Sequence, residues 1–158
     1  MADGVYNISK GRVIEFYNRV KSNDPAASTI RIFLMKANET EIDLVDHDDM
    51  AAMFGATGNT EADFTNYANK NLSDTALAAL PAPDDTNDRY EVDLPDQTWT
   101  SAGGATNNTL TKLVTAYDDD GSDTDSNTIP MTHHDFAVVT DGSDLTAQFN
   151  ALGFFRAA

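Results

Sequence analysis

An aspartate-rich segment, YDDDGSDTDSNTIP at 117–130, is the first place in this sequence where side-chain oxygens gather as calcium ligands do. An EF-hand loop needs oxygen ligands at positions 1, 3 and 5, a glycine at position 6 and a bidentate glutamate at position 12. With Gly121 at position 6, Ala116 occupies position 1 and Asn127 position 12, and neither supplies a carboxylate. A frame that begins at Asp118 replaces the required glycine by aspartate and the glutamate by isoleucine. We therefore expect a solvated turn between two strands and no specific metal site.

His133, His134 and Asp135 form a second cluster that could do chemistry. Neighbouring residues of a strand point to opposite faces, so His133 and Asp135 would share one face and His134 would lie on the other. Only His47 remains to complete a metal site with His133 and Asp135, and chance adjacency of two histidines on an acidic surface is the simpler interpretation. A small hydrolase that uses His133, His134 and Asp135 is kept as an alternative, and it requires a pocket around these residues.

Other catalytic signatures are missing from the sequence. There is no cysteine, no Gly-x-Ser-x-Gly nucleophile motif and no glycine-rich phosphate loop. The single tryptophan, Trp99, is interpreted as a core residue beside the segment 89–94. We predict no catalytic, cofactor-binding or metal-ligating residue, and hence neither an enzyme nor a cofactor.

Charge limits the kinds of partner. The 26 Asp and Glu residues against ten Lys and Arg give a formal net charge of −16 over 158 residues, a length typical of one domain. Nucleic acids and anionic membranes attract clusters of basic residues, so neither is an expected partner. No apolar run approaches the ~20 residues of a membrane span, and the first residues lack the apolar core of a signal peptide. These features predict a soluble protein made in a cytoplasm.

The elements that would position these residues follow from hydrophobic periodicity. Residues 12–20 fit both a helical stripe and one face of a strand, and their β-branched and aromatic residues favour a strand. Residues 29–37 alternate as a strand, so the turn-forming KSNDPAAS between the two segments predicts a β-hairpin. Two short helices with their N-cap residues are expected at 46–54 (Asp46) and 73–80 (Ser73).

The second half of the chain reads as short strands separated by loops rich in Asp, Asn and Gly. The expected strands are 89–94, 97–100, 110–117 and 134–140, with loops at 81–88 and 140–144. This pattern predicts a mainly β fold, namely an antiparallel β-sandwich or jelly-roll-like domain with one or two short helices and extended termini. An N-terminal arm of residues 1–12 would precede a single β-rich domain of residues 13–158.

Both ends of the chain carry residue types that are enriched at interfaces. The candidate partner-contact residues are Val5, Tyr6, Ile8, Phe154, Phe155 and Arg156. The alternative for the two phenylalanines is that they complete the core of the domain.

Four stretches, at 3–26, 66–72, 84–104 and 129–157, together cover about half the chain and resemble small virion structural proteins of tailed bacteriophages. The resemblance implies a capsid cement or decoration protein that binds the major capsid protein on the capsid exterior, often as a trimer, after synthesis in the host cytoplasm. It also allows a neck or tail component. A carbohydrate-binding β-sandwich module is a further alternative, which predicts exposed aromatic side chains near Tyr90 and Trp99.

Overall fold

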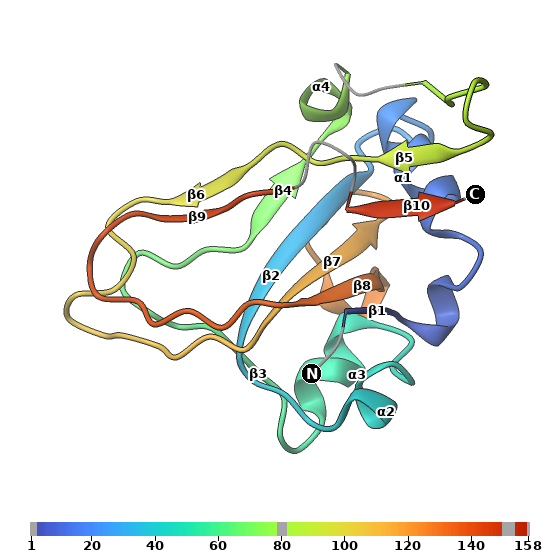
Figure 1. Ribbon diagram of the computed structural model, residues 1–158. Helices are drawn as coiled ribbons and strands as arrows, with labels where there is room; N and C mark the ends of the chain where they lie inside the picture. Colours follow the sequence, from blue (N-terminus) through green and yellow to red (C-terminus); the bar gives the residue numbers. More distant parts are fainter. Residues whose placement is uncertain (1–2, 79–81, 150–153, 158) are drawn as a thin grey trace.

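The computed structural model describes residues 3–78, 82–149 and 154–157 of the chain. At its centre lies an antiparallel sheet in the order β1-β8-β7-β2-β3, with β4 also paired to β2 (Figure 1). The strands of this sheet are β1 Gly4–Val5, β2 Thr29–Ala37, β3 Thr60–Glu61, β4 Lys70–Leu72, β7 Lys112–Asp118 and β8 Thr128–Asp135. Two small ribbons pair β5 Tyr90–Val92 with β10 Phe155–Ala157, and β6 Gln97–Trp99 with β9 Leu145–Ala147. The prediction of a mainly β, antiparallel fold is confirmed, and the described strands do not close into a barrel.

Both faces of the central sheet are covered. Ile30, Ile32 and Leu34 of β2 point to one face, as the alternation predicted, and Phe33 and Met35 point to the other. The first face packs on helix α1 and on the ribbons through Phe16, Tyr17, Val20, Val92 and Trp99. The second face packs on the N-terminal segment and on two short helices through Tyr6, Leu44, Met50 and Met53. The middle strands are therefore apolar on both sides.

The segment predicted as the first strand is helix α1, Val13–Lys21, so the expected hairpin over 12–37 is wrong. Val13, Phe16, Tyr17 and Val20 recur at helical spacing and are fully buried. Burying one such side chain is worth about 1.5–3 kcal/mol, whereas strand propensity differs by only ~1 kcal/mol between residue types. The helical stripe therefore decides the conformation. Both edges of β2 are already occupied by β7 and by β3 and β4, which leaves no place for a hairpin partner.

Three further helices are short. Helix α3, Met50–Gly55, confirms the expected helix but begins later, because Asp49 caps it by accepting the N–H of Ala52 at 2.7 Å, and Asp46 is not the cap. Helix α2, Glu41–Leu44, was not predicted. Helix α4, Asp74–Leu77, begins after Ser73, which takes the expected N-cap position but makes no side-chain capping hydrogen bond, and residues 79 and 80 lie outside the described residues. No helix in the described part of the chain has the length and apolarity needed to cross a membrane.

Strand β8 begins six residues before the predicted 134–140, and most of the predicted segment lies outside any strand. The sequence signal was hidden by Pro130, which lacks a backbone N–H and is unusual inside a sheet. Here Pro130 lies opposite Ala116 where the register shifts between Thr115 and Ala116, so the missing donor falls at a bulge. The part of β8 that carries His133 and His134 is therefore inside the sheet and is paired with β7.

The described part of the N-terminal segment is not a free arm. β1 adds to the edge of the sheet with Gly4 opposite His133 and Val5 opposite Thr132. A 3-10 turn, η1 at Asn7–Ser9, follows, and Ser9 Oγ donates to the carbonyl of Pro130 at 2.5 Å. Residues 3–9 are thus part of the same folded body as the sheet.

Candidate functional site

A pocket of about 350 Å³ lies where the end of β8 meets β9 and the C-terminal segment. Its polar lining consists of Asp3, His134, Asp135 and Gln148. Its apolar lining consists of Leu113, Phe136, Ala147, Phe149 and Phe154. The volume falls at the lower end of the range for small-ligand sites. The pocket joins one histidine of the predicted cluster to one of the predicted C-terminal contact residues.

The polar end of the pocket is held together by Asp3. One carboxylate oxygen of Asp3 accepts the backbone N–H of Asp135 at 2.9 Å, and the other lies 3.6 Å from Nδ1 of His134. The hydroxyl of Thr132 is 2.9 Å from Nε2 of His134. Burial lowers the pKa of His134, and the attraction of Asp3 does not reverse this. The imidazole is therefore neutral at neutral pH, and Asp3 stays ionised.

Behind this end, on the opposite face of the sheet, lies a buried ion cluster. Lys112 Nζ is 2.6 Å from Oδ1 of Asp135 and 2.7 Å from Oε1 of Glu41, and the lysine side chain is fully buried. Burial opposes the charged form of Lys112, but the hydrogen bonds to Asp135 and Glu41 prevail and raise its pKa. His133 Nδ1 lies 3.4 Å from Oε2 of Glu41. Its pKa is lowered by burial and then by the nearby ammonium of Lys112.

The apolar end of the pocket is aromatic. The ring of Phe154 makes edge contacts with His134 at 6.1 Å and with Phe149 at 6.0 Å between ring centroids. The backbone N–H of Phe154 donates to the carbonyl of Val92, and that of Phe149 donates to a carboxylate oxygen of Asp96, each at 2.9 Å. These bonds fix both phenylalanines relative to β5 and β6.

The predicted division of the histidines between two faces is confirmed. His133 packs against Tyr6 on one face of the sheet and His134 against Phe154 on the other. His47 is not brought to them, since its Nε2 pairs with Glu39 and it lies beside Asn59. Among the described residues, His47, His133 and Asp135 do not form a group whose ligand atoms all lie within 4.8 Å of one another.

The hydrolase alternative required a pocket around the histidine cluster. The pocket found here is lined by His134 and Asp135 but not by His133. None of its described lining residues carries a hydroxyl or thiol, so the lining offers no serine, threonine or cysteine nucleophile. The arrangement gives that alternative no support beyond the pocket itself.

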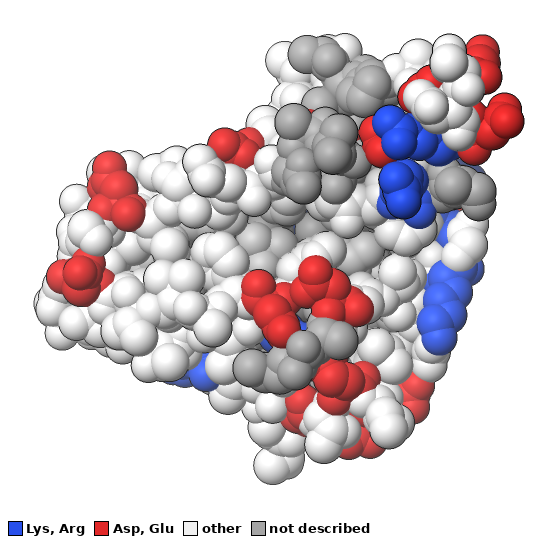
Figure 2. Space-filling view, in the orientation of Figure 1, with Lys and Arg blue, Asp and Glu red and all other residues white. Residues whose placement is uncertain are grey.

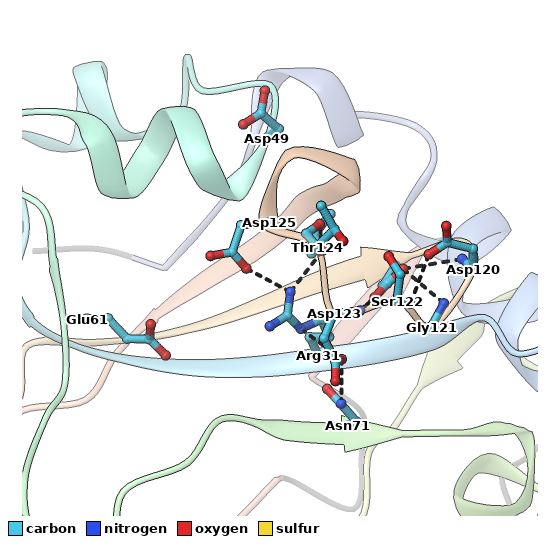
Figure 3. A network of polar contacts seen from close by, with 12 residues as sticks. Arg31, Asp49, Glu61, Asn71, Asp120, Gly121, Ser122, Asp123, Thr124 and Asp125 are labelled. Carbon is cyan, nitrogen blue, oxygen red and sulfur yellow. Dashed lines mark hydrogen bonds and ion pairs between the residues drawn. The ribbon is translucent and has the colours of Figure 1, made fainter.

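Carboxylates of the aspartate-rich loop accept hydrogen bonds from the backbone of the same loop (Figure 3). The buried carboxylate of Asp118 accepts backbone N–H groups of Asp120, Gly121 and Asp123 at 3.3, 3.1 and 3.0 Å. Asp118, Asp119 and Asp120 are the one group of three or more acidic or histidine side chains, within the described ranges, whose ligand atoms all lie within 4.8 Å of one another. Since its buried member is bonded to the loop backbone, the geometry favours a turn-building role.

Arg31 ties this loop to the sheet. Its guanidinium donates to Oδ1 of Asp125 at 2.8 Å and to the hydroxyl of Thr128 at 3.0 Å, and lies 3.6 Å from Asp123. The arginine side chain is only 4% exposed, and its charge is balanced by the two aspartates. A cationic residue already occupies the inner side of the acidic loop.

The candidate contact residues fall into different environments. Tyr6 is fully buried and its hydroxyl donates to the sulfur of Met53 at 3.1 Å, so within the folded subunit it belongs to the core. Val5 and Ile8 are half-buried. Phe154 lines the pocket, and Phe155, in β10, is half-buried opposite Val92.

Arg156, the last candidate, is exposed and lies 3.9 Å from Glu91. Sequence reasoning missed Asp3, Glu41 and Lys112. The available signal was Lys112 on the same strand face as Val114 and Ala116, since a lysine on an apolar face needs a buried counter-charge.

The aromatic residues named by the carbohydrate-binding alternative are not surface platforms. Trp99 is 1% exposed and its indole N–H donates to the carbonyl of Ala68 at 2.7 Å, which confirms its core role. The hydroxyl of Tyr90 donates to the side chain of Asn18 at 2.8 Å. The ring of Trp99 is therefore not free to stack on a sugar, and Tyr90 is half-buried.

Comparisons with known proteins give no relative for this chain. No protein-family model, no curated protein and no solved structure matches it.

Proposed function

We propose that this chain is a structural protein of a tailed-bacteriophage virion, most simply a capsid cement or decoration protein that bridges major capsid subunits as a homo-oligomer. The proposal starts from the resemblance of the four stretches at 3–26, 66–72, 84–104 and 129–157. A neck or tail position is the alternative within the same class. The finer assignment of the fold to a sandwich or jelly-roll type belongs to the same proposal.

One structural observation carries the proposal furthest, and it concerns the C-terminal strand. Within the described chain, β10 pairs with β5 alone, so one edge of this two-stranded ribbon has unpaired backbone groups. Such an edge accepts a strand from a neighbouring subunit by backbone hydrogen bonding. Arg156 is exposed on β10. A contact of this kind suits a protein that joins a lattice through its terminus.

The surface charge is consistent with a capsid exterior. Acidic side chains are scattered over the face shown in Figure 2, and the basic ones lie mostly on the side where α1 and β10 are found in Figure 1. With a net charge of −16 the protein is repelled by packaged DNA and stays soluble before assembly. Ile42, 78% exposed on α2, and Val139, 65% exposed, are further apolar groups for a protein partner.

The decisive experiment is the copy number of this chain in purified virions of the phage that encodes it. Quantitative mass spectrometry gives the ratio of this chain to the major capsid protein. A ratio that corresponds to one copy, or one trimer, per lattice position supports a cement role. A count of about six or twelve would move the protein to the neck or tail, where rings of that symmetry occur. Absence from the virion would overturn the proposal.

Truncation of the C-terminal strand tests the contact itself. Removal of residues 154–158 is expected to weaken binding to capsids. The substitution Arg156→Ala is the milder companion, since it leaves β10 paired with β5. Deletion of residues 1–8 is unsuitable for this purpose, because it removes the buried Tyr6 and would unfold the subunit.

A further inference from the structure

The pocket between β8, β9 and Phe154 has two chemically different ends. One end carries the carboxylate of Asp3 beside His134, whereas the carboxylate of Asp135 is turned to Lys112 on the opposite face of the sheet, and the other end is walled by phenylalanine rings. Figure 2 shows acidic side chains gathered on this face over β1 and the end of β8. The side chain of Asp3 is 65% exposed, so its carboxylate can be reached from outside.

The local charge is negative even after the buried lysine is counted. Asp3, Asp135 and Glu41 supply three carboxylates, and Lys112 supplies one ammonium. His133 and His134 add no positive charge at neutral pH, because burial lowers the pKa of each imidazole. An anionic ligand would meet repulsion here, whereas a cation would complement the uncompensated charge.

We infer that this pocket binds the side chain of an arginine presented by a partner protein. A planar guanidinium can donate to the carboxylate of Asp3 while its face lies against the rings of Phe149 and Phe154. The volume of about 350 Å³ accommodates one such side chain. In the assembly proposed above, that partner is the major capsid protein, so the identity of the partner rests on the proposed function. The chemistry of the pocket does not.

A metal ion fits this pocket less well than a guanidinium. The ligand atoms of Asp3, His134 and Asp135 do not all lie within 4.8 Å of one another, so the three residues do not form a coordination shell. One oxygen of Asp135 is already bonded to Lys112, and one oxygen of Asp3 accepts the backbone N–H of Asp135. The bond to Asp135 also holds the carboxylate of Asp3 in place before a ligand arrives, which lowers the entropic cost of binding.

The test is an NMR titration of the isolated, 15N-labelled protein with N-acetyl-arginine amide. Its neutral isostere, N-acetyl-citrulline amide, has nearly the same shape and serves as the matched ligand. We expect saturable shifts confined to residues 134–136 and 147–149 with the arginine probe, and a Kd of about 1–10 mM for so small a ligand. The citrulline probe should bind at least tenfold more weakly.

Two variants locate the interaction. Asp3→Asn is expected to raise the Kd about tenfold, because a charge-assisted hydrogen bond becomes a neutral one. Asp63→Asn is the matched control, since Asp63 is similarly exposed at 61% and lies outside the pocket. Phe154→Ala should weaken binding without removing a charge.

The inference is overturned if arginine and citrulline amides bind alike, or if neither produces saturable shifts at these residues. The same holds if Asp3→Asn retains full affinity while the spectrum shows an intact fold. None of these results depends on whether the protein is found in virions, so the inference and the proposed function can fail separately.

Discussion

Lys112 and Asp135 lie directly opposite each other across strands β7 and β8, with Nζ and Oδ1 2.6 Å apart. The same ammonium is 2.7 Å from Glu41 of helix α2. One buried charge thus joins the middle of the sheet, the end of β8 and a helix that covers the sheet. Asp135 in turn donates its backbone N–H to Asp3, so the N-terminal segment belongs to the same network.

Substitution of Lys112 is expected to be among the most destabilising single changes in the protein. Lys112→Met fills similar volume but leaves Glu41 and Asp135 without their shared counter-charge. Because these two side chains are about a third exposed, the loss in unfolding free energy should be about 2–4 kcal/mol, somewhat below that of a fully buried pair. Urea denaturation measures it. Lys36→Met removes an exposed pair with Asp63 and should cost under about 1 kcal/mol. Equal stability of the two variants would contradict this account.

Gly4 is expected to tolerate no side chain. A Cβ atom at Gly4 would lie 2.5 Å from Nε2 of His133, whose ring is buried against Tyr6 and has little room to move. Gly4→Ala should therefore lower the unfolding free energy by about 1–3 kcal/mol, as overpacking does. Gly55→Ala is the control, because a Cβ there meets nothing within 4 Å and alanine favours a helix. Thermal unfolding followed by circular dichroism compares them, and an unchanged melting temperature for Gly4→Ala would show that β1 is displaced without cost.

Stability should fall as the solution is acidified below about pH 6.5. The pKa values of His133 and His134 are lowered from 6.5 in the folded protein, chiefly by burial. Between the lowered and the ordinary pKa the unfolded chain binds more protons than the folded one, so the unfolding free energy decreases as pH decreases. Urea midpoints at pH 7.5 and 5.5 test this. His134→Gln should flatten the dependence while keeping a hydrogen-bonding side chain, and an unaltered slope would assign the effect to other groups.

Arg31 should control the order of the aspartate-rich loop. Arg31→Met removes the bonds to Asp125 and Thr128 and leaves Asp123 without its cationic neighbour. Faster amide hydrogen exchange is expected over residues 119–125, with a loss of about 2–3 kcal/mol in stability, because the aspartates stay partly solvated. Arg19→Met, which breaks an exposed pair with Glu15 on α1, should leave the exchange of this loop unchanged. Unchanged loop exchange in the Arg31 variant would mean that Asp118 alone organises the turn.

Local sequence signals identified several elements because each carried its own physical cause. The alternation of Ile30, Ile32 and Leu34 against Phe33 and Met35 gave strand β2 and its two faces correctly. The acidic residues before Met50 predicted helix α3, which begins a few residues later because Asp49 and not Asp46 is its cap. The division of His133 and His134 between faces followed from strand geometry alone.

The remaining elements depended on contacts between residues far apart in the chain. Residues 13–21 carry both helical and strand patterns, and only the burial of Phe16 and Tyr17 against the sheet decides for a helix. Pro130 concealed β8 because only the register shift in its pairing with β7 accommodates a residue without a backbone N–H. Phe154 gains its pocket from residues near 3, 113, 134 and 148, which no local pattern relates to it.

The amino-acid sequence by itself determined the mainly β composition, the strong negative charge and the two faces of the central strands, because these follow from residue type and period. Only the tertiary structure decided that Lys112 is neutralised by Glu41 and Asp135, that Tyr6 belongs to the core, and that Asp3 and Phe154 face one pocket. The physical reason is that burial and charge pairing are properties of neighbours in space, and the chain brings those neighbours together only when the sheet has formed.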